Sequence, residues 1–263
     1  MFSKAGKKKY NNQGRGCNNR CENEKLKRET APVGTKSRKR ILILTRGIAV
    51  GILASIIIIP ALGRDITIAE EQKSIRLTKP EIAGNPLMEV LAKRSSSRDF
   101  SSKPLPENIL SNMLWAAAGI NRPESGKRTA PTAMNKQEID VYVATVNGIY
   151  FYDAKSHTLK MIASGDLRGL TGEQDFVRKA AVNLIYVADY SRMSSASDQM
   201  KELYAAADTG FISENVYLYC ASTGLATVVR AYVDRPVLAK AMKLRADQKI
   251  ILAQSVGYPK HGR

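Results

Sequence analysis

The sequence predicts an α+β fold. Three observations lead to this class: an alternating β-hairpin pattern at residues 139–152, a long helical pattern that begins near residue 199, and apolar runs near residues 182 and 250 that suit buried strands. Strands and helices do not alternate regularly, and no internal repeat is present. We therefore expect one body that mixes helices with largely non-alternating strands.

The first elements of this body are two helices. Apolar residues at positions 87–91 suit a short helix that ends at a run of serines. Pro104 and Pro106 precede a second helix, in which apolar residues recur at helical spacing from Ile109 to Ala117. Trp115 lies on this helix, and we expect it to pack in the core or at an interface.

The hairpin is the clearest local pattern. Apolar residues alternate along "EIDVYV", the pair Asn147-Gly148 predicts a type I′ turn, and residues 149–152 return as the second strand. A polar helix is expected around residues 172–180. The run "AVNLIYVADY", residues 181–190, then predicts a strand that is buried on both faces.

The remaining elements begin with the long helix at residues 199–223. Gly224 is expected to end this helix as its left-handed C′ residue. A strand at 226–233, a short helix at 236–244 and a final strand at 248–259 follow. The helix's predicted buried face consists of Leu203, Ala206, Ala207, Phe211, Asn215, Leu218 and Cys220.

The charge of the chain is concentrated at its start. The formal net charge is +17, and the first 40 residues hold 13 Lys or Arg against 3 Asp or Glu, which is +10. The body has no basic–aromatic interleaving and no known nucleic-acid module, so nucleic acid is not an expected partner. Cys17 and Cys21 lack the further ligands of a zinc site, and no disulfide framework is implied.

Four segments follow from composition. We expect residues 1–40 to be a disordered basic tail. Residues 41–63 are a signal peptide or a membrane anchor, with a buried core helix as the alternative, because the apolar run is intermediate in length between an h-region and a spanning helix. Residues 64–85 are a linker, and residues 86–263 are the working domain. We expect the protein to be exported or membrane-anchored, with its basic tail in the cytoplasm.

An anion-binding segment is predicted at "KRSSSRDF", residues 93–100. Arg94, Ser96 and Arg98 stand at alternate positions, so in an extended segment their side chains point to one face. Two guanidiniums and a hydroxyl suit one phosphate, and Lys260 and Arg263 add charge at the end of the chain. The Gly119–Lys127 stretch is no P-loop, because its glycine spacing is wrong and Arg128 follows the lysine.

The body resembles the FMN-dependent nitroreductase-like family, in particular its branch with the thiazoline/oxazoline oxidases and exported proteins of this fold. The resemblance spans residues 86–260. The segments that carry it are "RSSSRDF" (94–100), "MLWAAAGINR" (113–122), "RTAPTAMNKQEIDVYV" (128–143), "GIYFYD" (148–153), "DTGFISENVYLYCASTGLATV" (208–228) and "VGYPK" (256–260). The implied fold is a central, mainly antiparallel sheet flanked by helices, in a homodimer with one FMN at each of two subunit interfaces.

The resemblance also implies roles for particular residues. Arg94, Ser96 and Arg98 match the motif that would hold the FMN phosphate and ribityl chain, and Lys260 matches the basic end of the family. Gly224 and Leu225 match a turn whose backbone N–H groups would approach the reactive edge of the ring. The segment that would reach the flavin of the partner subunit consists of Pro131, Thr132, Ala133 and Asn135.

The implied activity is that of an FMN-dependent oxidoreductase. NADH or NADPH would give hydride to the flavin, which would reduce a small planar acceptor such as a nitroaromatic or a quinone; no side chain would be a dedicated acid or base. Two alternatives stay open: a flavin oxidase of peptide heterocycles, and a non-catalytic membrane-surface protein that has lost its flavin. Nicotinamides are scarce outside the cytoplasm, so the donor of an exported enzyme is undetermined by sequence.

Overall fold

A seven-stranded sheet organises the part of the chain that this computed structural model describes, residues 73–261. The order is β1-β6-β5-β4-β7-β9-β8, and each neighbouring pair is antiparallel. The predicted α+β class and antiparallel sheet are confirmed. The strands are Ser74–Arg76 (β1), Ile139–Thr145 (β4), Gly148–Asp153 (β5), Thr158–Ser164 (β6), Val182–Asp189 (β7), Ala226–Arg230 (β8) and Gln248–Gly257 (β9).

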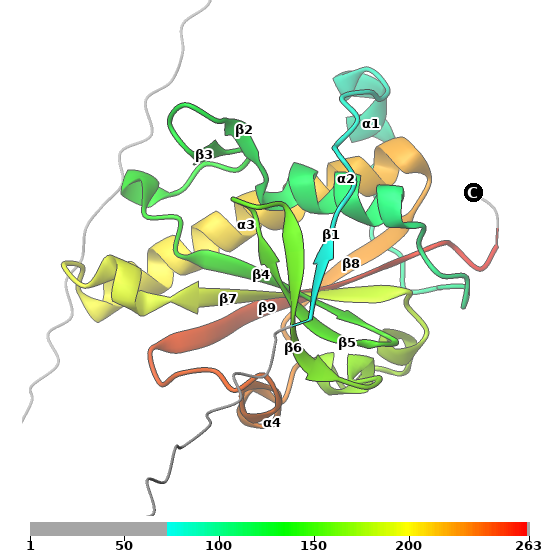
Figure 1. Cartoon of the computed structure of the whole chain (residues 1–263). Coiled ribbons are helices and arrows are strands. Elements are labelled where there is room, and N and C mark those ends of the chain that lie inside the picture. Colours follow the sequence, from blue (N-terminus) through cyan, green and yellow to red (C-terminus); the bar gives the residue numbers. More distant parts are fainter. Residues whose placement is uncertain (1–72, 262–263) are drawn as a thin grey trace, which may run out of the picture. The chain divides into compact units, whose positions relative to one another are not determined.

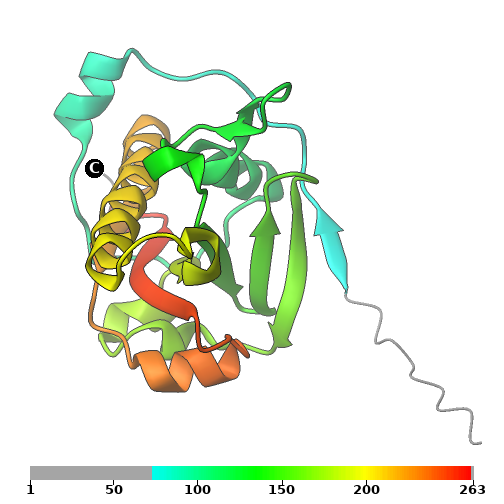
Figure 2. The same cartoon turned by 90° about the vertical axis from the view of Figure 1, so that its left-hand side faces the viewer.

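Helices cover both faces of the sheet (Figure 1). The α2 and α3 helices pack on one face, where Met113, Leu114 and Ile212 are buried. The short α4 packs on the other face through Leu238, as Figure 2 shows from the side. The helices are Leu87–Lys93 (α1), Glu107–Ala118 (α2), Asp198–Thr223 (α3) and Arg235–Ala241 (α4), and all four were expected from apolar spacing.

Shorter elements connect these layers. A small hairpin and four single 3₁₀ turns lie between the main elements: Ile120–Arg122 (β2), Lys127–Arg128 (β3), Ala133–Asn135 (η1), Arg168–Thr171 (η2), Asp175–Arg178 (η3) and Tyr190–Met193 (η4). The polar helix expected at residues 172–180 is reduced to η3. Its sequence offers too few apolar positions to bury more than one turn, and Val177 is the buried residue of that turn.

The hairpin is confirmed, but its predicted turn is wrong. Thr145 pairs with Gly148, so the two loop residues are Val146 and Asn147. Neither has a positive φ, as a type I′ turn would require. The Thr145 hydroxyl stabilises the observed turn instead, because it accepts the Asn147 N–H at 3.1 Å.

Part of the predicted linker belongs to the sheet. Within residues 64–85, Ser74–Arg76 form β1, which pairs with residues 158–160 of β6. Leu77 is buried in the main core, and the Ser111 hydroxyl donates to the Thr78 carbonyl at 2.6 Å. A strand of three residues is too short to show an alternating pattern, so no sequence pattern predicted β1.

The predicted buried face of α3 is largely wrong. Leu203 and Phe211 are 58% and 48% exposed, and Ala206 and Ala207 are also exposed. Cys220 is buried as predicted. The other residues of α3 that face the core are Ala205, Asp208, Thr209, Ile212, Ser213, Val216 and Ala221. The helix has apolar residues on two sides, and periodicity does not show which side meets the sheet.

Several predictions fall outside the described residues. They concern the basic tail with Cys17 and Cys21, the apolar segment at 41–63, the first part of the linker, and Arg263. Within residues 73–261, no helix is both long enough and apolar enough to cross a bilayer.

Candidate functional site

The segment Arg94–Phe100 leaves α1 and runs beside the ends of β8 and β9. The Ser97 N–H donates to the Thr227 carbonyl at 2.9 Å. The Lys260 N–H donates to the Asp99 carbonyl at 3.3 Å, and Phe100 pairs with Pro259 as an isolated bridge. The structure thus brings the serine–arginine segment and the end of the chain together, although they are 160 residues apart in sequence.

Tyr217 of α3 supports this segment, and no sequence pattern indicated its role. The Arg94 guanidinium lies over the Tyr217 ring, 5.5 Å from its centroid. The Tyr217 hydroxyl accepts the Val229 N–H at 2.9 Å and shares a hydrogen bond of 2.9 Å with the Ser96 hydroxyl. It therefore fixes two of the predicted phosphate-binding residues relative to α3 and β8.

The cations of this strip are unpaired. Arg94, Arg98 and Lys260 are exposed, and no carboxylate of the described residues forms a salt bridge with any of them. The nearby Asp99 instead lies 3.7 Å from the His261 ring nitrogen. Three positive side chains without a salt bridge, on neighbouring stretches of backbone that also carry the Ser96 hydroxyl, suit a phosphate group, which carries about −1.5 to −2 charges at neutral pH.

Gly224 ends α3 next to this strip. Its φ is 71°, which confirms the predicted left-handed C′ residue, and no atom lies within 4 Å of where a Cβ would stand. The N–H groups of Gly224 and Leu225 both donate to the Cys220 carbonyl, and the Leu225 side chain is buried. Both amides thus take part in the helix-ending turn, and the turn offers open space at Gly224.

The Pro131–Asn135 segment lies over a different part of α3. The Ala133 N–H donates to Asp208 Oδ2 at 2.8 Å, and the Thr132 hydroxyl accepts the Gln137 N–H at 3.1 Å. The Asn135 side chain is exposed, and its Oδ1 accepts from the Gln137 amide at 3.2 Å. Pro131 is also exposed, so the segment presents polar groups to the outside.

The two predicted halves of the site do not meet within one chain. Asp208 and Tyr217 are nine residues apart on α3. At about 1.5 Å of rise per residue, the Pro131–Asn135 segment and the arginine strip are anchored about 13 Å apart along the helix axis. The structure therefore brings Arg94, Ser96, Arg98, Lys260 and Gly224 to one end of α3, and places residues 131–135 towards its middle.

A buried charged cluster lies beneath the Pro131–Asn135 segment, and no sequence pattern indicated it. Burial raises the pKa of the Asp140 carboxyl, although Arg192 pairs with it at 2.9 Å and favours its charged form. Burial lowers the pKa of the Arg128 guanidinium. Burial and the neighbouring Asp208 raise the pKa of Glu138 to about 7. These groups come from different elements, so they become neighbours only in the folded chain.

Comparisons with known proteins concern the family and the fold. The model of the nitroreductase family matches residues 91–258. A protein of Methanocaldococcus jannaschii that is named as a nitroreductase is 30% identical over 175 residues, which cover 62% of this chain and 88% of that protein. A crystal structure from Ralstonia eutropha, also named as a nitroreductase, is 43% identical with a TM-score of 0.69, and covers 74% of this chain and 93% of that one.

A more distant solved structure shares the fold. The NADPH:FMN oxidoreductase of Vibrio harveyi, in complex with NAD⁺, is 18% identical with a TM-score of 0.51, and covers 68% of this chain and 70% of that one. The family model alone matches more than half of the present chain. The chain therefore belongs to the nitroreductase family.

Proposed function

We propose that the protein is an FMN-dependent oxidoreductase that takes hydride from NADH or NADPH and reduces a small planar acceptor. The observation that carries the proposal is the strip of unpaired cations, Arg94, Arg98 and Lys260, beside the Ser96 hydroxyl. Membership of the nitroreductase family supports an oxidoreductase. The Vibrio harveyi protein with this fold is by name an NADPH:FMN oxidoreductase, which supports the choice of cofactor and donor.

In this proposal the strip binds the phosphate of FMN. The guanidiniums of Arg94 and Arg98 and the ammonium of Lys260 would donate to its oxygens, and charge-assisted bonds of this kind are the strong ones in proteins. Tyr217 keeps Arg94 and Ser96 in place through its ring and hydroxyl. The open space at Gly224 leaves room for the cofactor to pass close to the end of α3.

A homodimer would complete the site. The arginine strip alone does not enclose a planar ring, and the Pro131–Asn135 segment of the same chain is anchored about 13 Å away along α3. In a two-fold dimer, that segment of one subunit would meet the strip of the other, and two equivalent sites would form. Asn135 and the hydroxyl of Thr132 would then approach the flavin from the partner.

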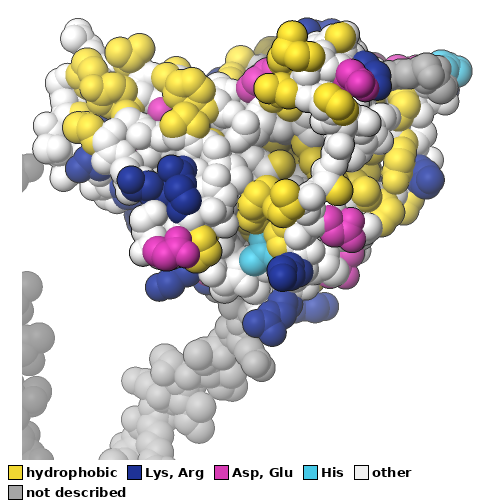
Figure 3. All heavy atoms as spheres, turned by 90° about the horizontal axis from the view of Figure 1, so that it is seen from above, with side chains coloured by type: hydrophobic (Ala, Val, Ile, Leu, Met, Phe, Trp, Pro, Cys, Tyr) yellow, Lys and Arg dark blue, Asp and Glu magenta, His cyan; other side chains and the backbone are white. Residues whose placement is uncertain are grey.

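Exposed apolar residues support such a dimer. Figure 3 looks onto the helical side of the domain and shows several groups of hydrophobic side chains there. Large apolar side chains that are exposed on this chain and would be covered by a second copy include Leu87, Met88 and Leu91 of α1, Met134 of η1, and Leu203 and Phe211 of α3.

The flavin would supply the hydride chemistry, and the chain would bind the flavin and fix its orientation. The arginine strip orients the cofactor through its phosphate. The dimer interface excludes water from the faces of the ring, and the polar groups of residues 131–135 fix its position. This division requires no general acid or base among the site residues, as the family resemblance implies.

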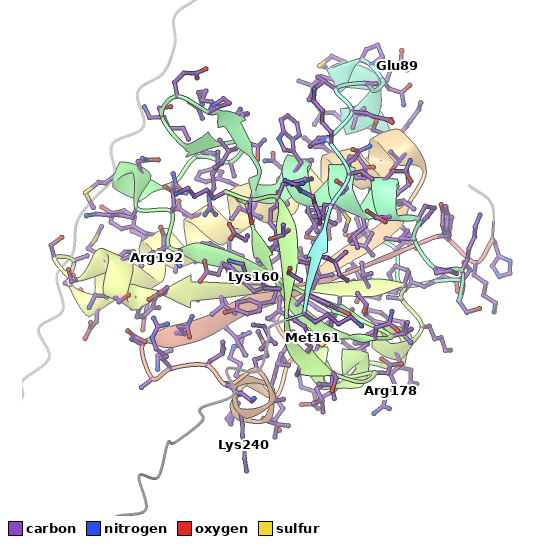
Figure 4. The ribbon with its side chains drawn as sticks, viewed as in Figure 1. Glu89, Lys160, Met161, Arg178, Arg192 and Lys240 are labelled. Atoms are coloured by element: carbon purple, nitrogen blue, oxygen red, sulfur yellow. The ribbon has the colours of Figure 1, made fainter. Side chains whose placement is uncertain are left out.

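Flavin binding tests the proposal. We expect the purified protein to be yellow or to bind added FMN, and Arg98→Ala to bind it more weakly, because a charge-assisted hydrogen bond contributes about 1.5–3 kcal/mol. Lys240→Ala is the matched control: Lys240 is an exposed cation on α4 (Figure 4), which packs on the face of the sheet opposite α3. Equal FMN affinity in the Arg98 variant, the control and the unmodified protein would contradict the assignment.

Stopped-flow spectroscopy tests the donor. Anaerobic mixing of the flavin-loaded protein with NADPH or NADH should bleach the flavin absorbance. A loaded protein that neither nicotinamide reduces would contradict the proposed donor and leave an oxidase that takes hydride from another substrate. A protein that binds no flavin at all would contradict the whole proposal.

A further inference from the structure

Two carboxyl groups are buried directly beneath the Pro131–Asn135 segment. The Glu138 side chain is fully buried, and Asp208 is 2% exposed. Glu138 precedes β4 and is held there because its carbonyl accepts the Asp189 N–H at 2.9 Å. Asp208 lies in the middle of α3, where its Oδ2 accepts the Ala133 N–H at 2.8 Å. Neither residue belongs to the predicted site.

The two carboxyl groups favour a shared proton. Among the described residues, no N–H or hydroxyl group donates to either oxygen of the Glu138 carboxyl, and both oxygens are inaccessible to solvent. The neighbouring buried carboxyl group is that of Asp208, and its presence favours the neutral form of Glu138. Two adjacent ionised carboxylates in a buried site repel each other, so the arrangement favours a proton on the Glu138 carboxyl.

The surrounding charges do not remove this preference. Arg192 of η4 is the cation that favours the ionised form of Glu138, but it donates to the Gln137 carbonyl at 2.7 Å and pairs with Asp140 of β4 at 2.9 Å. It also lies 3.6 Å from Asp189 of β7. Figure 4 shows Arg192 where β7 ends and β4 begins.

Within residues 73–261, the nearby Arg128 of β3 forms no hydrogen bond or salt bridge with either member of the pair. Its Nη1 donates to the Ile139 carbonyl at 3.4 Å, and its charge interacts mainly with Asp140. The Arg192 guanidinium is thus committed to Asp140, Asp189 and a backbone carbonyl, whereas the buried Nε of Arg128 has no hydrogen-bond partner among the described residues. Burial is the largest cause that raises the pKa of Glu138 to about 7, followed by the neighbouring Asp208.

The segment above the pair is strained. Met134, Asn135 and Gln137 have φ values of 50°, 53° and 50°, a left-handed conformation that residues other than glycine rarely adopt. Such a backbone persists only where its surroundings hold it. The Ala133–Asp208 hydrogen bond is one of the contacts that hold it, together with the Gln137 amide, which donates to the Gly126 carbonyl at 3.1 Å.

We propose that Glu138 and Asp208 form a proton-sharing carboxyl pair that positions the strained segment 131–137 for contact with the flavin of the partner subunit. The inference rests on the proposed function, because it gives the pair a role in cofactor binding. Loss of the shared proton places two negative charges side by side. Their repulsion displaces Asp208 from the Ala133 N–H and releases the segment. Both are positioning residues, since neither reaches the molecular surface.

Flavin affinity as a function of pH tests the proposal. The dissociation constant of FMN, measured by quenching of its fluorescence, should rise about tenfold between about pH 6 and about pH 8, because the binding-competent form holds one more proton. Glu138→Gln is a neutral isostere that can donate to Asp208, and its FMN affinity should vary less over this range. Glu124→Gln, at an exposed position between β2 and β3, should keep the profile of the unmodified protein.

A readout on the flavin-free protein separates this inference from the proposed function. The infrared carbonyl band of a protonated carboxylic acid should be present near neutral pH in the unmodified apoprotein and lost in Glu138→Gln. If the first variant does not fold, Asp208→Asn removes the charge that would repel an ionised Glu138, so the FMN affinity of this variant should also vary less between about pH 6 and about pH 8. Absence of the band from the unmodified protein would overturn the pair. Parallel pH profiles for the unmodified and Glu138→Gln proteins would overturn its positioning role, whereas FMN affinity at pH 6 would still support the proposed function.

Discussion

At the scale of single residues, a binding site can be predicted from the sequence when its residues lie close together in one short segment. Arg94, Ser96 and Arg98 stand at alternate positions, and the structure places them beside Lys260. Tyr217 and the Glu138–Asp208 pair gave no such signal, because each owes its role to partners that are distant in sequence. A tyrosine on a helix or a glutamate beside a predicted strand shows no special role in the sequence, because its role depends on contacts that form only in the folded chain.

Two carboxyl groups should change the stability of the apoprotein in opposite directions with pH. Glu138 has its pKa raised from 4.5 to about 7, so the folded chain retains a proton that the unfolded chain loses. Its contribution is fully present below about pH 4.5 and is lost as the pH rises through 7. Burial raises the pKa of Asp153, but hydrogen bonds from Lys160 (Figure 4) and Ser156 outweigh burial and hold it at about 2. That contribution is present above about pH 4 and is lost as the pH falls through 2.

Urea unfolding of three apoproteins checks this pair of signs. Glu138→Gln should flatten the decline in unfolding free energy between about pH 4.5 and 7, and leave the acid limb unchanged. Asp153→Asn should flatten the acid limb alone. If both variants follow the unmodified protein across the neutral range, Glu138 does not hold a proton in the folded state.

At the scale of elements, the existence and type of each long element could be predicted, but its orientation could not. The α3 helix and its left-handed end at Gly224 follow from spacing and glycine chemistry. Its buried face does not, because Asp208 and Ser213 turn inward where hydrogen bonds satisfy them, while Leu203 and Phe211 turn outward. A prediction from hydrophobic periodicity assumes that a helix has one buried apolar side. It fails for a helix that has a second apolar side exposed to solvent.

Two glycines of α3 should respond oppositely to the same substitution. Gly224→Ala should lower the unfolding free energy by about 1–2 kcal/mol, because its φ of 71° strains any residue with a Cβ although space is available. Gly210→Ala, in the exposed interior of the helix with equal space, should raise it by up to about 1 kcal/mol. Denaturant titration of both variants measures the difference, and equal effects would contradict the left-handed end.

At the scale of the whole molecule, the sequence predicted where the working domain lies but set its start too late. The β1 strand and the buried Leu77 precede residue 86 and belong to the domain's sheet and core. We still propose, from residues 41–63, that the protein is exported or membrane-anchored. The composition of that segment is its basis.

Truncation separates the domain from what precedes it. Deletion of residues 1–63 should leave a soluble, folded domain that binds FMN, because that deletion retains β1 and Leu77. Deletion of residues 1–80 should lower the melting temperature, because it uncovers the edge of β6 and removes the carbonyl of Thr78 from Ser111. Identical melting temperatures for the two truncations would contradict the place of β1 in the fold.

The central claim is that a flavin lies between two copies of the chain, with its phosphate on one and its ring against residues 131–135 of the other. Co-expression of Arg98→Ala and Asn135→Ala, with two tags to isolate the mixed dimer, tests it most directly. In that dimer one site carries both lesions and the other carries none. We predict about one FMN per mixed dimer at unmodified affinity, and weaker binding by either variant alone. A mixed dimer without any tight site would place both segments around the same flavin within a single chain and contradict the account.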